Sequence, residues 1–293
     1  MNVKDCIIIF FTLILSLEGR ERLKKNIDDG IAWGTLQDVG GSNSFYIGKY
    51  STLSLFPLTP SGHIKLPTYV KRVWIDVGAN ARSFSDTCGV CVRSFFPNRS
   101  SLRDEFLSAP KDLQVIAIDA NSFFYDSLSK LKNVVAIPCV LSFVDGFVTF
   151  YHYAGDGCSS TLPPNRLAKN NDGIPKACKD VVRIERICSM TLETILKKIP
   201  PNISVELLKV DAQGTDLEVV QSAGTELFRI EKVILEAQED RKNDTSHIIS
   251  LNSDTVSDAK KWLSSRGFKE NKNLSYLENG AVLEWNLVFD RVF

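Results

Sequence analysis

Short apolar runs alternate with helix-like segments along the chain from Tyr69 onward. Runs of this kind, rich in β-branched residues, are typical of parallel strands that are buried on both faces of a sheet. The pattern predicts strands at 73–77, 114–118, 134–140, 205–210 and 232–236, and helices at about 121–131, 190–198, 214–223 and 255–266. Because strands and helices alternate, we expect an α/β fold with a doubly wound, mostly parallel sheet.

A different pattern interrupts this alternation in the middle of the chain. Residues 147–153 and 181–187 alternate apolar and polar positions, as half-exposed antiparallel strands do. They enclose residues 155–180, a segment dense in Gly, Pro, Asn and Lys. The chain ends with another strand-like run at 281–289, which we expect to pair antiparallel to its neighbours. The sequence thus predicts a β-meander insertion and an antiparallel final strand.

The 293 residues divide into three segments. Residues 1–19 contain an apolar run at 6–17, whose length fits a signal peptide or a short anchor better than a membrane span. The basic residues after this run lie on the side that disfavours translocation, so a buried or partner-packed segment is the alternative. Residues 20–65 are charged and then rich in Gly and Ser, which is typical of an extension or linker. Residues 66–293 form the expected α/β domain, without a second domain boundary.

Cysteines and glycosylation sequons bear on the compartment. Besides Cys6 the chain has six cysteines, an even number that suits a secreted, disulfide-bonded protein. Four sequons favour the same route: Asn98, Asn202, Asn243 and Asn273. We therefore expect the secretory lumen, or membrane anchoring through 6–17, with the cytoplasm as the alternative. Cys139 lies in an apolar run and is expected to be buried, whereas the cysteines that flank the loop-rich stretch can pair: Cys158, Cys178 and Cys188.

The net charge limits the range of partners. Thirty-five Lys and Arg residues balance 35 Asp and Glu residues. Nucleic acids and anionic membranes attract proteins through a basic excess or a basic face, so we expect no nucleic-acid partner. Membrane association is expected only through residues 6–17. A small-molecule or glycan ligand remains the expected partner.

Acidic residues follow three of the predicted strands. Asp76 closes the first strand, Asp119 the second, and Asp211 follows the fourth. In open parallel sheets, ligands bind outside the carboxyl ends of the strands. Gly78 lets the backbone approach a ligand closely, and the Asp119 carboxylate can accept hydrogen bonds from two ribose hydroxyls. Each residue alone also suits a strand-ending turn or a helix cap, but the three in this order predict a binding site.

Two other functions, a nucleotide-cofactor enzyme and a metal or redox site, are less well supported by the motifs. Asn80 and Ser83 stand where the dinucleotide fingerprint has glycines, so an NAD-dependent or nucleotide-sugar enzyme is disfavoured. Cys88 and Cys91 form a Cys-x-x-Cys motif, but the three histidines do not have the spacing of metal ligands. We therefore expect a local disulfide or surface thiols there, and no metal site.

These motifs resemble those of the FkbM-type S-adenosylmethionine-dependent methyltransferases. The resemblance covers roughly residues 70–290. It depends on six segments: VWIDVGAN (73–80), IAID (116–119), SFVDGFVTFY (142–151), GCSSTL (157–162), LKVDAQGTDLEVVQSAG (208–224) and VILEAQ (233–238). It implies a Rossmann-like sheet and S-adenosylmethionine as the cofactor.

The resemblance also implies roles for single residues. Asp119 holds the ribose of the cofactor, and Asp211 faces the transferring methyl group as the expected catalytic residue. The methionine side of the cofactor is held by four residues of the first motif: Asp76, Gly78, Ala79 and Asn80. The expected reaction is methylation of a hydroxyl on a small polar acceptor such as a sugar, with Asp211 orienting or deprotonating it and 155–180 acting as a lid.

Some positions depart from the family pattern. Arg82 stands where a second glycine is usual, and it can either crowd the methionine moiety or pair with its carboxylate. Asp119-Ala120 replaces the usual Glu-Pro, and Gln213 replaces the usual Glu. These departures motivate an alternative function, a non-catalytic protein of the same fold that acts as a lumenal binding or scaffold module. His152 is the histidine expected nearest the acceptor and can act as a base at neutral pH.

Overall fold

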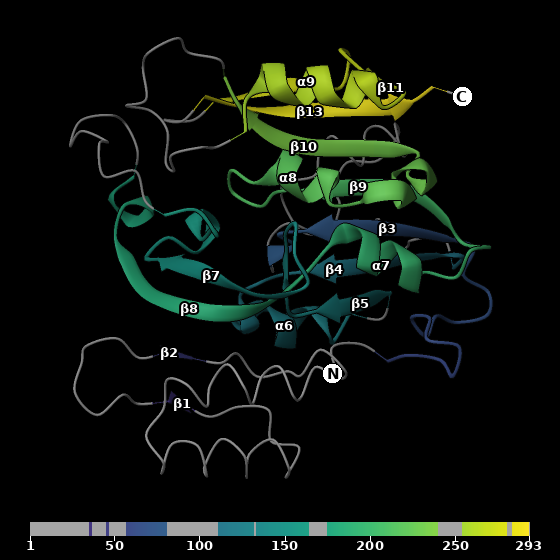
Figure 1. Cartoon of the computed structure of the whole chain (residues 1–293), viewed down its shortest axis with the longest axis horizontal. Helices are drawn as coiled ribbons and strands as arrows, with labels where there is room; N and C mark the ends of the chain where they lie inside the picture. The colour runs from purple at the N-terminus through teal and green to yellow at the C-terminus, as the bar shows by residue number, and fades with distance from the viewer. Residues whose placement is uncertain are drawn as a thin grey trace.

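A computed structural model describes residues 57–80, 111–131, 133–163, 175–239, 254–279 and 283–292, and two short paired strands, β1 (Thr35–Leu36) and β2 (Phe45–Tyr46) (Figure 1). The apolar run at 6–17, Arg82 and the Cys88–Cys91 motif lie outside these residues. Among the helices of the described part, none combines the length and the apolar character needed to cross a bilayer.

The main sheet in the described residues has eight strands: β3 (Arg72–Val77), β4 (Leu113–Ile118), β5 (Val134–Ile137), β9 (Ser204–Val210), β10 (Lys232–Gln238), β11 (Phe268–Glu270), β12 (Tyr276–Asn279) and β13 (Leu283–Arg291). Their order is β11-β13-β10-β9-β3-β4-β5, and β12 also pairs with β13. The strands from β10 to β5 run parallel, and β13 is antiparallel to β10. The expected Rossmann-like, doubly wound sheet with an antiparallel final strand is therefore confirmed.

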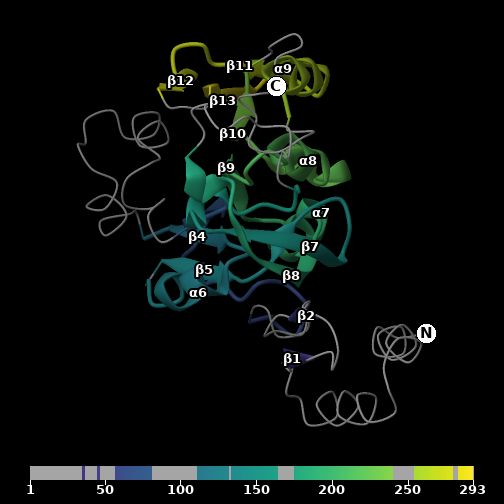
Figure 2. The same ribbon diagram turned by 90° about the vertical axis from the view of Figure 1, so that its left-hand side faces the viewer.

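Helices cover both faces of this sheet. On one face lie α7 (Leu192–Lys198), α8 (Asp216–Gln221) and α9 (Val256–Ser265), whose apolar side chains share one core cluster with β3, β9 and β10. On the other face, α6 (Ser122–Leu128) packs Phe124 and Leu128 against Ala117 of β4. Figure 2 shows α7 and α8 on one side of the sheet and α6 on the other. All six residues of β4 are buried, and all but Gln114 are apolar, as a strand covered on both faces requires.

A second sheet forms the predicted insertion. It contains β6 (Val140–Leu141), β7 (Gly146–Tyr153) and β8 (Val181–Met190) in the order β6-β8-β7, with β7 and β8 antiparallel. The single strand expected at 134–140 is wrong. Pro138 has no N–H to donate to a sheet, so β5 ends at Ile137 and the chain enters the second sheet at Val140. The β7–β8 pair curves away from the main sheet in Figure 1.

The cysteines in the described residues divide into two pairs. Cys158 and Cys178 form a disulfide that links the two ends of the segment between β7 and β8. Cys139 and Cys188 are free and buried, which confirms the expectation for Cys139 and excludes Cys188 from this disulfide. The disulfide ties down the start of the insertion segment, which bears on the pocket described below.

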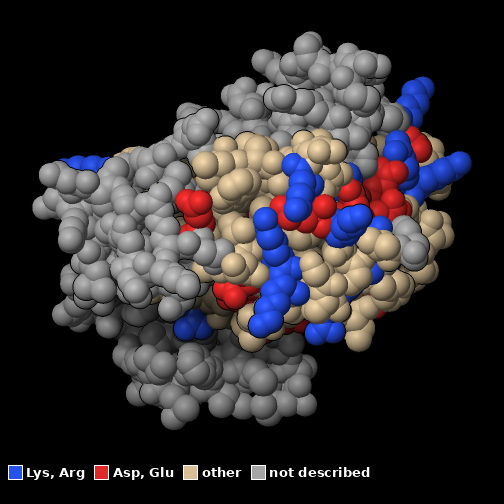
Figure 3. All heavy atoms as spheres, turned by 90° about the horizontal axis from the view of Figure 1, so that it is seen from above, with Lys and Arg blue, Asp and Glu red and all other residues tan. Residues whose placement is uncertain are grey.

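Acidic and basic side chains are mixed on the surface. Figure 3 shows Lys and Arg side chains next to Asp and Glu side chains on the face seen from above. Two ion pairs in the C-terminal part illustrate this, Lys232 with Asp290 at 2.6 Å and Lys260 with Glu270 at 3.0 Å.

Candidate active site

The carboxyl ends of β3, β4 and β9 lie side by side at the centre of the main sheet. Val77, the last residue of β3, pairs with Ile118 of β4 on one side and with Val210 of β9 on the other. β4, the next strand of this sheet along the chain, lies on one side of β3, and β9 lies on the other. The carboxyl end of β3 is therefore a topological switch point, where open α/β sheets bind ligands.

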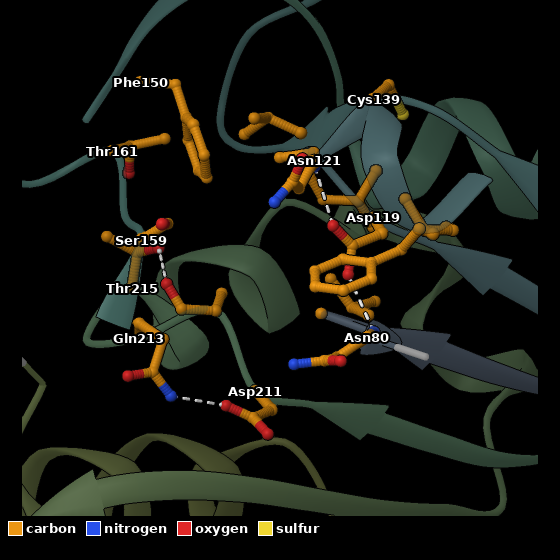
Figure 4. Close-up of a pocket in the computed structure, with 18 of the residues that line it drawn as sticks. Asn80, Asp119, Asn121, Cys139, Phe150, Ser159, Thr161, Asp211, Gln213 and Thr215 are labelled. Carbon is orange, nitrogen blue, oxygen red and sulfur yellow. Dashed lines mark hydrogen bonds between the residues drawn. The ribbon is translucent and has the colours of Figure 1, made fainter. Parts of the chain in front are cut away.

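A pocket opens at these strand ends (Figure 4). Four of the predicted site residues line it: Gly78, Asn80, Asp119 and Asp211. The other lining residues come from the strand ends, α6 and the insertion: Val77, Ile118, Ala120, Asn121, Phe124, Cys139, Val140, Leu141, Phe150, Gly157, Ser159, Thr161, Ala212, Gln213 and Thr215. Among the described lining residues, the charged ones are Asp119 and Asp211 alone, so this part of the wall is acidic.

Asp119 is fixed by the backbone on both sides of its carboxylate. Oδ2 accepts a hydrogen bond from the Asn80 N–H at 2.8 Å, and Oδ1 accepts one from the Asn121 N–H at 2.7 Å. Burial raises the pKa of Asp119 to about 6, although these two hydrogen bonds act in the opposite direction. A carboxylate has about four acceptor sites, so each oxygen keeps a lone pair for a ligand in the pocket.

Gly78 has a positive φ of 70° and lies against Asp211. A Cβ at position 78 would lie 1.8 Å from the Asp211 carbonyl oxygen, and the Asp211 N–H donates to the Val77 carbonyl at 3.0 Å. Glycine is therefore required here for the close contact between the ends of β3 and β9. The sequence predicted a close approach to a ligand, and Gly78 does line the pocket, but the tightest contact is with protein backbone.

Asp76 and Ala79 differ from the other predicted residues of the first motif. Asp76 is buried, forms an ion pair with Lys209 at 3.4 Å, and is not among the residues that line the pocket. Ala79 is fully buried in the apolar cluster under α6. Both residues support the strand end rather than contribute to the described pocket wall.

Asp211 projects from the end of β9 with donors on both of its oxygens. Lys209 Nζ lies 3.3 Å from Oδ2, and Gln213 Nε2 donates to Oδ1 at 2.7 Å. Gln213 adopts a left-handed backbone with φ of 55°, which turns its side chain back toward Asp211. The turn itself is held by Asp216, whose carboxylate accepts hydrogen bonds from the N–H groups of Ala212 and Gly214.

Burial strongly perturbs the acids around this turn. The pKa of Asp216 is well above its ordinary value because the side chain is fully buried, with the charge of Asp211 as the next cause. Burial also raises the pKa of Glu236 on β10, and the charge of Asp211 acts in the same direction. Clusters of perturbed acids are common at functional sites.

The insertion closes one side of the pocket. Ser159 and Thr161 line it, and between them the buried hydroxyl of Ser160 donates to the Gln213 carbonyl at 2.8 Å. Ser160 also bridges to Tyr151 of β7, and the Cys158–Cys178 disulfide holds the start of the segment. The part of the expected lid at 164–174 lies outside the described residues.

His152 is held away from the pocket wall. Its Nε2 lies 2.8 Å from Glu185 Oε2, and Arg183 approaches the same ring. It is buried and is not among the described lining residues. Of the two acid–base candidates named from the sequence, Asp211 is the one that reaches the pocket.

Sequence reasoning did not single out Lys209 or the pocket-facing hydroxyls of the insertion. Lys209 had a detectable signal, because a lysine inside the apolar run of a buried strand needs charged partners. Ser159 and Thr161 lie in a segment that the resemblance quoted, but only the pairing of β7 and β8 brings them to the pocket.

A family model described as the methyltransferase FkbM domain matches residues 76–270, more than half of the chain. The chain belongs to the FkbM methyltransferase family. Methyltransferases of this family use S-adenosylmethionine, so the cofactor inferred from the sequence is confirmed at the level of the family. The matched region contains the three strand ends and the insertion of this FkbM domain.

The chain also has a distant likeness to solved structures. No curated protein matched the chain. Among solved structures, it is similar to LepI in complex with SAM, at 12% identity and a TM-score of 0.34 over 88% of this chain and 50% of LepI. It is also similar to a SAM-dependent methyltransferase from Aquifex aeolicus, at 10% identity and a TM-score of 0.32 over 76% of this chain and 84% of that one. The chain thus spans about half the length of LepI.

Proposed function

We propose that this FkbM-family protein transfers a methyl group from S-adenosylmethionine to a hydroxyl group on a small polar acceptor such as a sugar. The observation that carries the proposal is that Asp119 and Asp211 line one pocket, directly after the two strands that flank β3. The first suits a ribose, and the second suits a reacting hydroxyl.

The residues of the pocket fit the cofactor. The free lone pairs of Asp119 suit the two ribose hydroxyls, and Gly78 and Asn80 lie next to it for the methionine side. Apolar residues that line the pocket suit the adenine ring: Ile118, Phe124, Val140 and Leu141. When bound, the cofactor supplies an electrophilic methyl group on a positively charged sulfur.

The other side of the pocket suits a hydroxylated acceptor. Ser159, Thr161 and Gln213 offer hydroxyl and amide groups, which both donate and accept hydrogen bonds. Phe150 adds an aromatic surface. Because the described wall is acidic, it favours a neutral acceptor over a phosphorylated or carboxylated one.

Asp211 has the position of a group that orients or deprotonates the acceptor. Methyl transfer is an in-line displacement, so the enzyme must chiefly align the nucleophile and exclude water. A carboxylate that accepts the hydrogen bond of the acceptor O–H aligns its oxygen and can take up the proton. Contacts with Lys209 and Gln213 fix the orientation of this carboxylate, which lines the pocket.

We also propose a secretory or membrane-anchored location through residues 6–17. The disulfide between Cys158 and Cys178 supports an oxidising compartment. Asn202 and Asn273 are exposed, as glycan attachment requires. Expression in a eukaryotic secretory host tests this: a glycosidase-sensitive mobility shift is expected, and an unmodified chain in the cytosol would contradict the location.

The reaction is tested with S-adenosylmethionine labelled on the transferring methyl group and a panel of neutral sugars and polyols. We expect label in an alkali-stable methyl ether, and loss of at least about 100-fold in turnover for Asp211→Asn. Asp290→Asn is the matched control, because this carboxylate lies near the opposite end of β10 and pairs with Lys232. The proposal would be contradicted if no hydroxylated acceptor is methylated, or if Asp211→Asn retains full turnover.

A further inference from the structure

The Asp211 carboxylate is held from both sides by two neighbours on its own strand end. Lys209 reaches Oδ2 at 3.3 Å, and Gln213 donates to Oδ1 at 2.7 Å (Figure 4 shows the second bond). With both oxygens engaged, the side chain has one favoured orientation. Gln213 lines the pocket, whereas Lys209 lies beneath it and is buried.

Lys209 also connects β9 to β3. Its ammonium lies 3.4 Å from Asp76 Oδ1, so one buried cation serves two carboxylates at the topological switch point. Burial alone would lower the pKa of Lys209, but the charges of Asp76 and Asp211 raise it above its ordinary value. The other acids near the cluster are Glu236 on β10, Asp216 on α8 and Asp119 directly after β4.

The amide at position 213 is the second part of this arrangement. A glutamate at this position would bring a second carboxylate against Asp211 Oδ1, where Gln213 now donates at 2.7 Å. Two carboxylates at such a distance cannot both stay ionised. The amide of Gln213 therefore gives Asp211 a hydrogen-bond donor where a glutamate would repel it.

We propose that Lys209 and Gln213 are positioning residues, which hold the Asp211 carboxylate in one orientation, directed at the sulfonium charge of the cofactor. This inference rests on the proposed function. Without Lys209, Asp76 and Asp211 lose the cation that they share, and the repulsion between the two carboxylates turns Asp211 away from its present orientation. Without the Gln213 amide, Asp211 loses the hydrogen bond that orients it but keeps the ion pair with Lys209.

The test compares the affinities for S-adenosylmethionine and S-adenosylhomocysteine, which differ by the methyl group and the positive charge on sulfur. Calorimetry on the full chain gives the ratio of the two dissociation constants. We expect Asp211→Asn to reduce the preference for S-adenosylmethionine at least about fivefold, because the facing charge is lost. Lys209→Met should produce a similar loss although Asp211 is still present, and Gln213→Met a loss of about threefold.

A double variant and a matched control separate positioning from general destabilisation. If Lys209 acts through Asp211, the Lys209→Met/Asp211→Asn double variant should lose no more preference than the stronger single variant. Arg72→Met is the control. Arg72 bridges Asp112 and Glu206 at the opposite ends of the same strands, so its loss should lower stability and leave the preference unchanged. Gln213→Met and Lys209→Arg serve if Lys209→Met does not fold, and Lys209→Arg should retain most of the preference.

The outcomes are distinguishable. The inference is overturned if Asp211→Asn lowers the preference while Gln213→Met and the folded Lys209 variant retain it, or if Asp211→Asn itself changes nothing. In both cases, binding of the cofactor by the wild type leaves the proposed methyltransferase function standing. Absence of binding to either compound by the wild type contradicts the proposed function as well.

Discussion

A Cβ on Gly78 would lie 1.8 Å from the carbonyl oxygen of Asp211. The two residues are 133 positions apart in the chain, yet their backbones are in contact because β3 and β9 are neighbours and end together. This contact brings the first and the fourth strand ends of the FkbM domain to one pocket. The spacing between the two strand ends therefore depends on a residue without a side chain.

Replacement of this glycine should be severe. We expect Gly78→Ala to lower the free energy of unfolding by about 3 kcal/mol or more, since the new Cβ clashes with backbone and the positive φ adds strain. Gly62→Ala is the matched control, because Gly62 has a φ of 81° and open space around it. This change should cost only about 1 kcal/mol. Urea denaturation measures both, and equal losses would show that the contact with Asp211 is unimportant.

Cofactor binding should weaken in mild acid. The pKa of Asp119 is raised by burial to about 6, so the charged carboxylate that we propose as the hydrogen-bond acceptor for the ribose is lost as the pH falls below that value. We expect the affinity for S-adenosylhomocysteine to be constant above pH 7 and to fall from about pH 6 downward, up to about tenfold per pH unit. Calorimetry between pH 5 and 8 checks this.

Asp119→Asn provides the control for the pH effect. It should bind weakly at every pH and show no inflection near pH 6. An unchanged inflection would assign the effect to another group. The sign for stability is opposite: the folded pKa lies above the ordinary value of 3.8, so the folded chain binds this proton more tightly. The stabilising effect of protonation is complete below about pH 4 and is lost as the pH rises through about 6.

Loss of the Cys158–Cys178 disulfide should loosen the insertion. The bond closes a loop of 20 residues, for which a stabilisation of about 3 kcal/mol is typical. Reductant should therefore lower the melting temperature of the wild type and weaken binding of the acceptor more than binding of the cofactor, since Ser159 and Thr161 follow Cys158. The Cys158→Ser/Cys178→Ser variant should already show both effects and respond less to reductant. If reductant leaves the melting temperature of the wild type unchanged, the stabilising role of the disulfide is contradicted.

The central strands β3, β4, β9 and β10 were predictable because they are mostly apolar runs rich in β-branched residues. Burial on both faces of a parallel sheet demands such runs, and β3, β4, β9 and β10 follow the expected ranges closely. The edge strands β11 and β12 were not predicted. They are short and contain polar residues, and β13 pairs with both, so tertiary pairing rather than local sequence makes them strands.

The site was predictable where a polar residue directly follows a buried strand. Gly78, Asn80, Asp119 and Asp211 follow this rule and line the pocket. Residues that reach the site through long-range pairing could not be found locally, as Ser159 shows. Asp76 was predicted in the site by the same rule but does not line the described pocket. A carboxylate at a strand end can instead form an ion pair with a buried lysine, here Lys209.

The central claim is that the ends of β3, β4 and β9 jointly bind S-adenosylmethionine. Titration of the purified full chain with this compound, in the wild type and in Asp119→Ala, tests it most directly. We expect one bound molecule per chain and an affinity that drops at least about tenfold in the variant. No binding by the wild type, or equal affinities in the two proteins, would contradict it.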